Sequence, residues 1–275
     1  MMQTGENILD RLWLWGMKVN CLQATADYAK CGFAPSTLTT EQAIEQTGIS
    51  NVLMAGGLEI SEQSLAAMPS ARRIICKTSL HKYNYSEEKF YLDYDDAESQ
   101  LLAAKRLAGQ DTRVEAFLFD DFSTGSMDAG VSSTHLAKLQ YTNATVGPHI
   151  PLYGTIYMHS LEREGLADLL RYFDLSVLPL WYSDEIDKVP EAVERCADLS
   201  GDKPIHVCLY FYDFGKKKAI TRDEMQHQLD VVEPLIRSQR IAGLVFLGTC
   251  MMDLGWDSTA CVYDWISKVG GKSGI

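Results

Sequence analysis

Two acidic residues stand side by side at the end of an apolar run, in the segment FLFDDF that contains Asp120 and Asp121. Two ionised carboxylates this close repel each other, and burial at a strand end removes part of their solvation. Both effects raise the pKa of one partner, which is how a carboxylic acid stays protonated near neutral pH. Alternatively, one Asp caps the next helix and the other pairs with a lysine. Because aromatic residues end several neighbouring apolar runs, we favour a catalytic pair.

Cleavage of a glycosidic bond is a reaction that uses two carboxyl groups in this way. One carboxyl is protonated and donates to the leaving oxygen, while the other is ionised. If Asp120 and Asp121 do not supply both, we expect the second catalytic carboxylate from Asp213, Asp184 or Glu185, which end later apolar runs. A separation of about 5–5.5 Å between the two carboxyls would indicate retention of configuration, and a wider one inversion.

Aromatic and polar side chains at the ends of the apolar runs are candidates for holding a sugar. Sugar rings stack their apolar faces on aromatic rings, and polar side chains hydrogen-bond the sugar hydroxyls. The residues expected to bind substrate are Trp15, Lys77, Tyr157, His159, Trp181, Tyr182, Asp184, Tyr212 and Trp256.

Eight apolar runs supply the strands that would position these residues. They are rich in aromatic and β-branched residues and are bounded by Gly, Pro, Asp or Ser. The expected strands cover 12–20, 51–57, 73–79, 115–122, 151–159, 176–182, 205–214 and 242–250. Amphipathic segments between them predict helices over 39–47, 61–68, 86–108, 132–143, 162–173, 188–199, 222–238 and 259–269. Thr39 is a predicted N-cap, and Thr221 with Glu224 predicts a capping box.

This unbroken row of strand–helix units predicts an α/β protein, a single (β/α)8 TIM barrel formed by residues 1–275. In that fold the strands are parallel, and catalytic groups project from their C-terminal ends. The chain length of 275 residues matches one barrel of about 250 residues. An open doubly wound sheet is the rival architecture, but no glycine-rich phosphate loop follows any of the runs.

Alternation along the strands predicts which side chains face the barrel interior. In the run 205–214, Val207, Leu209 and Phe211 suit the helix-facing side, so the opposite row should line the barrel. The residues expected inside are His206, Cys208, Tyr210 and Tyr212 in that run, Thr155, Tyr157 and His159 in the run 151–159, and Asp120 in the run 115–122, with Asp121 at the rim.

An apolar strand that ends in Asp120-Asp121 within this barrel pattern resembles the glycoside hydrolase barrels, especially the N-acetylglucosaminidases that use the substrate's own acetamido group. The resemblance implies that Asp120 orients the 2-acetamido group and that Asp121 acts as general acid and then base. The ending Trp181-Tyr182 followed by Asp184 is similar to an aromatic-plus-Asp ending in chitinase-like barrels. The spaced acids that run along the fourth strand of chitinases are missing from this chain.

A metal-dependent sugar isomerase or lyase is one alternative on the same barrel. A divalent metal would take its ligands from His81, His159, Asp120, Asp121 and Glu59. Each histidine stands alone, without H-x-H or H-x-x-E-H spacing, so we expect no metal and no other cofactor.

Lys77 lies inside an expected strand, where lysine is uncommon. A desolvated lysine there could attack a carbonyl as a Schiff-base aldolase does. A salt bridge to Asp120 or Glu59 is the structural alternative, and we favour it. A catalytically silent barrel that binds a glycan or a protein is the third alternative function.

The chain carries a net charge of −12. Nucleic acids and anionic membranes attract basic patches, so we expect neither as a partner and instead a small-molecule or oligosaccharide substrate. No apolar run approaches the roughly 18 residues of a membrane span, and no signal peptide is visible. The seven cysteines show no C-x-x-C spacing, which favours free thiols in a cytoplasmic protein. Short segments after the strands predict an open site, which a neighbouring subunit could complete in an oligomer.

Overall fold

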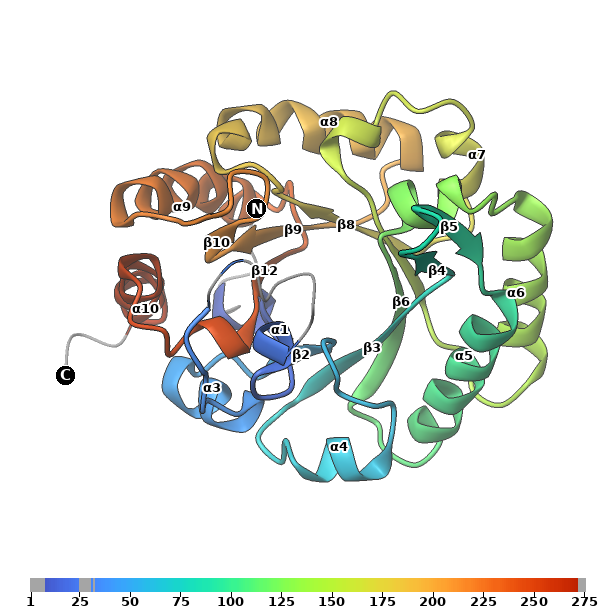
Figure 1. The fold of residues 1–275 in the computed structure, drawn as a ribbon, viewed down its shortest axis with the longest axis horizontal. Coiled ribbons are helices and arrows are strands. Elements are labelled where there is room, and N and C mark those ends of the chain that lie inside the picture. The colour runs from blue at the N-terminus through green and yellow to red at the C-terminus, as the bar shows by residue number, and fades with distance from the viewer. Residues whose placement is uncertain (1–7, 25–30, 32, 272–275) are drawn as a thin grey trace.

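The computed structural model describes residues 8–24, 31 and 33–271, and it contains a closed barrel of eight parallel strands (Figure 1). Going around the barrel, the order is β1-β12-β9-β8-β7-β6-β3-β2. The strands are β1 (Leu12–Gly16), β2 (Asn51–Met54), β3 (Arg73–Ser79), β6 (Val114–Asp120), β7 (Leu152–Thr155), β8 (Leu175–Pro179), β9 (Ile205–Tyr210) and β12 (Gly243–Leu247). Each lies within or beside one of the eight expected runs, so the predicted (β/α)8 barrel is confirmed.

Helices connect the strands and surround the barrel. They are α1 (Cys21–Ala24), α3 (Thr40–Thr47), α4 (Glu62–Ala66), α5 (Tyr94–Ala108), α6 (Ser133–Thr145), α7 (Leu166–Leu170), α8 (Val189–Ser200), α9 (Arg222–Arg237) and α10 (Asp257–Val269). Thr39 and Thr221 are N-caps, as predicted. The predicted capping box at Thr221 is present, and Thr39 forms one with Gln42 that was not predicted. No helix in the described ranges is long and apolar enough to cross a membrane.

Two small hairpins were not predicted. One pairs β4 (His81–Asn84) with β5 (Lys89–Leu92), and the other pairs β10 (Tyr212–Asp213) with β11 (Lys218–Ala219). The first overturns the expected helix start at residue 86, because residues 81–84 and 89–92 pair as an antiparallel ribbon. The helix begins only at Tyr94. The segment after β3 is therefore longer than a simple connection.

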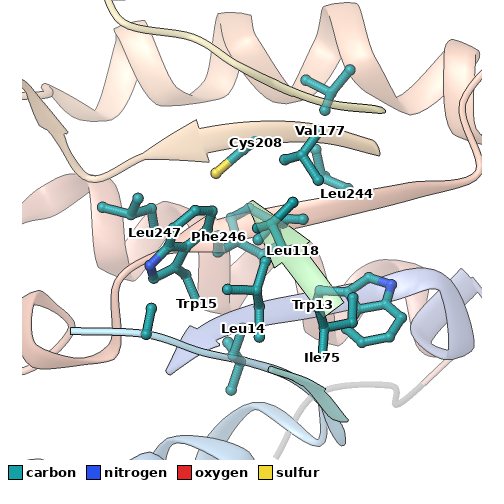
Figure 2. Packing of buried hydrophobic residues seen from close by; sticks show 14 of the residues in the cluster. Trp13, Leu14, Trp15, Ile75, Leu118, Val177, Cys208, Leu244, Phe246 and Leu247 are labelled. Carbon is teal, nitrogen blue, oxygen red and sulfur yellow. The ribbon is translucent and has the colours of Figure 1, made fainter. Parts of the chain in front are cut away.

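Buried side chains fill the interior of the barrel (Figure 2). Trp13 is 1% exposed, and Leu118 and Ile75 are fully buried. Neighbouring strands bring residues of the same row side by side, as in the pairs Trp15 with Leu247 and Lys77 with Leu118. This packed interior gives the strand ends a rigid base.

Short irregular helices follow several strands at the C-terminal end of the barrel. They are η2 (Phe122–Ser126), which is a π-helical turn, and the 3-10 turns η3 (Met158–Ser160), η4 (Ser183–Lys188) and η5 (Thr249–Met251). A further 3-10 turn, η1 (Ile8–Arg11), precedes β1. The turns η2, η3 and η5 replace the extended backbone that was expected at residues 122, 158–159 and 249–250, and β8 ends at Pro179, before the expected residue 182.

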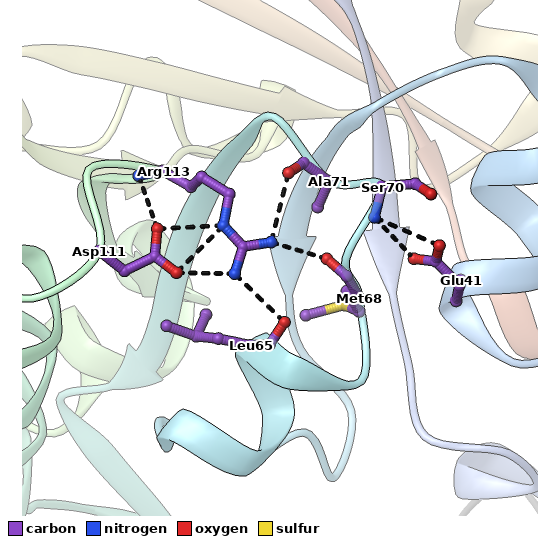
Figure 3. Close-up of polar contacts among 7 residues, drawn as sticks. All are labelled: Glu41, Leu65, Met68, Ser70, Ala71, Asp111 and Arg113. Atoms are coloured by element: carbon purple, nitrogen blue, oxygen red, sulfur yellow. Dashed lines mark hydrogen bonds and ion pairs between the residues drawn. The ribbon is translucent and has the colours of Figure 1, made fainter.

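Arg113 ties together the segments at the opposite, N-terminal end of the barrel (Figure 3). Its guanidinium donates to the carbonyls of Met68 at 2.8 Å and Leu65 at 3.3 Å. It also pairs with Asp111, with an N–O distance of 2.6 Å. Close by, the Glu41 carboxylate accepts from the backbone N–H of Ser70 at 3.2 Å.

Candidate active site

A cavity of about 470 Å³ opens at the C-terminal ends of the barrel strands. The predicted site residues that line it are Trp15, Lys77, Asp120, Asp121, Tyr157, His159 and Trp181. They come from β1, β3, β6 and the segments after β6, β7 and β8. The barrel therefore gathers at one point side chains that are up to 166 positions apart in the sequence (from 15 to 181).

Asp120 is held by two polar partners at the inner wall of the barrel. Lys77 Nζ lies 2.6 Å from Oδ2, and the Thr155 hydroxyl donates to Oδ1 at 3.2 Å. The predicted alternative of a salt bridge between Lys77 and Asp120 is thus present. Burial lowers the pKa of Lys77, but the Asp120 carboxylate outweighs burial and the pKa lies above its ordinary value. Lys77 is therefore an ammonium ion that pairs with the Asp120 carboxylate.

Asp121 follows β6 in a left-handed conformation, with φ 47° and ψ 35°. Its side chain lines the cavity, and the Tyr157 hydroxyl donates to Oδ1 at 2.5 Å. Burial and the negative charge of Asp120 raise the pKa of Asp121 to about 6, against the opposing effects of Tyr157 and Lys77. The pKa of one carboxyl in the adjacent pair is thus raised, as the sequence predicts.

Aromatic rings form one side of the cavity. Tyr157 and Trp181 meet edge to face with ring centres 5.8 Å apart, and Trp181 stacks on Phe214 at 5.6 Å. His159 is exposed and stacks on Tyr157 at 5.5 Å. Burial and the nearby acidic groups raise the pKa of Tyr210, so its hydroxyl stays protonated.

Three predicted acidic residues lie outside the described lining of the cavity. Asp213 is 1% exposed and accepts from the Ser183 backbone N–H at 2.8 Å and hydroxyl at 2.6 Å. Asp184 pairs with Lys216 at 2.7 Å on the surface. Glu185 pairs with Lys188 at 3.0 Å and lines a separate pocket of about 260 Å³.

Three predicted aromatic residues also lie outside that lining. Tyr212 stacks on Trp256 with ring centres 5.8 Å apart. Tyr182 is 40% exposed, and its ring covers Gly215, where an added Cβ would be 2.0 Å from the ring. Tyr212 contacts Phe214, which lines the cavity, with ring centres 5.2 Å apart.

Several lining residues are absent from the predicted set. Tyr210 could have been included, because strand alternation places it inside the barrel on the same row as Cys208. Ser79 ends β3, and Thr124 and Phe214 lie in segments after strands, where period-2 alternation no longer applies. Among the described residues, no three His, Cys, Asp or Glu side chains are grouped as metal ligands would be.

No protein-family model matches the sequence, and no curated protein matches it. Solved structures do match, and they are barrels. A family 113 β-mannanase from Alicyclobacillus acidocaldarius is 10% identical with a TM-score of 0.56, covering 97% of this chain and 99% of its own. The active domain 2 of a chitinase from Pyrococcus furiosus is 10% identical with a TM-score of 0.52, covering 96% and 97%.

A barrel of different chemistry matches equally well. A probable 2-pyrone-4,6-dicarboxylic acid hydrolase from Acinetobacter baumannii is 8% identical with a TM-score of 0.51, covering 94% of this chain and 92% of its own. At such low identity these matches show the fold alone. The chain has the fold of glycoside hydrolase TIM barrels, as the sequence resemblance indicated, and its chemistry must be argued from the site.

Proposed function

We propose that this protein is a glycoside hydrolase for a substrate that carries a 2-acetamido group, with Asp121 as general acid and base and Asp120 as the orienting carboxylate. The observation that carries the proposal is the difference between two adjacent carboxyls in one cavity. Burial and the neighbouring Asp120 raise the pKa of Asp121 to about 6, whereas Asp120 forms an ion pair with Lys77 at 2.6 Å. A catalytic acid is most effective when its pKa lies near the working pH.

The contacts of Asp121 assign different tasks to its two oxygens. Tyr157 donates to Oδ1, so Oδ2 is the oxygen that carries the proton. Asp121 Oδ2 then donates this proton to the glycosidic oxygen as the C1–O bond breaks. In the second step the same carboxylate removes a proton from the water that attacks C1, which restores the acid.

The substrate supplies the nucleophile in this scheme. Among the described residues that line the cavity, Asp120 and Asp121 are the carboxylates, and they are neighbours in the chain. The acetamido carbonyl oxygen therefore attacks C1 and forms a cyclic oxazolinium ion, while Asp120 accepts a hydrogen bond from the acetamido N–H. Water opens the ring at C1 and releases the sugar with its acetamido group intact. The leaving alcohol holds the proton from Asp121.

The aromatic side of the cavity suits a sugar ring. Trp181 stacks on Phe214 and meets Tyr157 edge to face, so its ring is held in place by its neighbours. A pre-set aromatic face binds an apolar sugar face with little loss of side-chain entropy. His159 and Tyr210 would hydrogen-bond sugar hydroxyls from the same side.

The charge of Lys77 disfavours the aldolase alternative. An attacking lysine must be a neutral amine, which enzymes obtain by desolvation or by a neighbouring cation. Lys77 instead has an anionic neighbour at 2.6 Å and a raised pKa. We therefore assign Lys77 to holding Asp120.

The test is turnover of nitrophenyl glycosides, with and without the N-acetyl group, by wild type, Asp121→Asn and Asp184→Asn, each with and without EDTA. We expect N-acetylated substrates to be cleaved, and Asp121→Asn to lower kcat about 10²–10⁴-fold. Asp184 is an exposed acid outside the cavity lining, so Asp184→Asn should retain activity. Cleavage that Asp121→Asn does not affect would contradict the assignment. Activity that EDTA abolishes would favour a metal-dependent reaction, and binding without turnover a glycan-binding barrel.

A further inference from the structure

The position of the Asp121 carboxyl depends on a strained backbone turn. Asp120 ends β6 and points inward, so in an extended strand the next side chain would point away from the barrel interior. The left-handed conformation of Asp121 instead brings its side chain to the cavity. This conformation costs a non-glycine residue about 1 kcal/mol, although Asp tolerates it better than most. Surrounding contacts must therefore hold it.

The π-helical turn η2 closes directly over this residue. The backbone N–H of Ser126 donates to the Asp121 carbonyl at 3.2 Å, and the Thr124 hydroxyl donates to the same oxygen at 3.3 Å. The start of the turn is held by Ser123, whose hydroxyl accepts from the Tyr157 backbone N–H at 2.9 Å. Any shift of Ser126 is thus transmitted to the backbone of Asp121.

His81 packs against the two residues that complete this turn. Its Nδ1 shares a 3.0 Å hydrogen bond with the Ser126 hydroxyl. Its Nε2 lies so close to Gly125 that a Cβ added there would be 2.3 Å away. The imidazole therefore occupies the space that the glycine leaves free, and both ring nitrogens face η2.

The hairpin formed by β4 and β5 fixes the imidazole from the other side. Phe90 meets the ring edge to face at 5.0 Å, and Leu92 is the cross-strand partner of His81. The base of the hairpin is closed by the Asp93 backbone N–H, which donates to the Leu80 carbonyl at 2.8 Å. The hairpin lies against η2 at the mouth of the barrel (Figure 1).

We propose that His81 is a positioning residue: it braces Gly125 and Ser126 so that the left-handed turn holds the Asp121 carboxyl in the cavity, within reach of Tyr157. The β4–β5 hairpin is then the support of the catalytic acid. The positioning role of His81 rests on the proposed function only in tests that measure activity. The position of Asp121 can be measured without substrate.

The first measurement is a ¹³C NMR titration of the aspartate carboxyls, with the Asp121 signal assigned by its loss in Asp121→Asn. In His81→Ala the released turn exposes Asp121 to water, so we expect its pKa to fall from about 6 toward the ordinary value of 3.8. Gly125→Ala pushes the turn away from an intact His81 and should produce the same fall. His81→Asn can still hydrogen-bond Ser126 and should restore part of the wild-type value.

His135→Ala is the matched control, because His135 also bonds a serine hydroxyl, that of Ser132 at 2.9 Å, at the start of α6. It should lower stability and leave the Asp121 titration unchanged. If His81→Ala and Gly125→Ala both fold and Asp121 titrates as in wild type, the proposal is wrong. The same holds if His135→Ala moves the titration equally.

The second measurement is the pH profile of kcat on the cleaved glycoside. A displacement of about 1 Å at a reacting group lowers rates up to about 100-fold, so we expect His81→Ala to lose 10- to 100-fold in kcat with little change in KM. The basic limb of its profile should move to lower pH, and added imidazole should restore activity. A shifted NMR titration in a protein that cleaves no glycoside would leave the positioning role intact and contradict only the proposed function.

Discussion

Both ends of the barrel hold partly buried charges, but these charges are paired differently at the two ends. At the N-terminal end, the Arg113 guanidinium meets the Asp111 carboxylate and backbone carbonyls, which carry no charge of their own. At the C-terminal end, two adjacent carboxyls share the single ammonium of Lys77, and one of them has a pKa of about 6. The first arrangement balances charge and joins segments together. The second raises the pKa of one carboxyl in the cavity, which is the property that the proposed hydrolase reaction requires.

The largest effect that we expect is at the N-terminal end, where Arg113→Met should lower the stability of the protein. The methionine keeps an apolar stem but leaves the carbonyls of Leu65 and Met68 and the Asp111 carboxylate without their donor. The free energy of unfolding should fall by about 2–4 kcal/mol, measured by urea denaturation, with unchanged kcat.

The exposed pair of Arg171 with Asp168 offers a matched control for that experiment. Its side chains are 67% and 69% exposed, so Arg171→Met should change the unfolding free energy by less than about 1 kcal/mol. Equal effects of the two substitutions would contradict the structural role that we assign to the N-terminal end.

An intermediate effect is expected from Lys77→Met at the C-terminal end. Without the ammonium, Asp120 and Asp121 share one proton up to a higher pH, because their mutual repulsion is no longer offset. The optimum of the pH–rate profile should move upward, in the direction opposite to that of His81→Ala, and kcat at pH 6 should fall about 10- to 100-fold. A profile that keeps its position would show that Lys77 does not set the charge of the pair.

The last effect concerns the cost of burying Asp121. Its folded-state pKa of about 6 is raised above the ordinary 3.8, so its contribution to stability is fully present below pH 3.8 and is lost as the pH rises through 6. The substitution Asp121→Asn removes the ionisable carboxyl and therefore this loss of stability at higher pH. The variant should gain up to about 3 kcal/mol relative to wild type between pH 4 and 8, measured as the difference in unfolding free energy at each pH. A difference independent of pH would contradict the raised pKa.

Strand periodicity explains why so much of the barrel could be predicted. The strands β1, β2, β8, β9 and β12 are buried at every residue, which produces apolar runs of recognisable length. Alternation in the expected runs 205–214 and 151–159 then correctly places Tyr210 and Tyr157 on the cavity side. Asp120 and Asp121 were visible as a pair because charged residues are rare at the end of such a run.

The parts that could not be predicted depend on contacts between distant segments. The β4–β5 hairpin competes with a helical pattern in residues 86–92. The contacts of His81 with η2 and with Phe90 form only together with this hairpin. The expected position of Asp121 at the rim assumed extended backbone, which the left-handed turn does not have. No local pattern shows that Asp213 accepts three hydrogen bonds from Ser183 and Lys216 instead of lining the cavity.

The left-handed turn at Asp121 also constrains how this position can change in evolution. Glycine, asparagine and aspartate are the residues that adopt this conformation most easily, and asparagine differs from aspartate by a single nucleotide in both codons. That one change would keep the turn, the cavity and the aromatic face while removing the transferable proton. A sugar-binding pseudoenzyme is thus one mutation away from the hydrolase proposed here, and the return path is equally short.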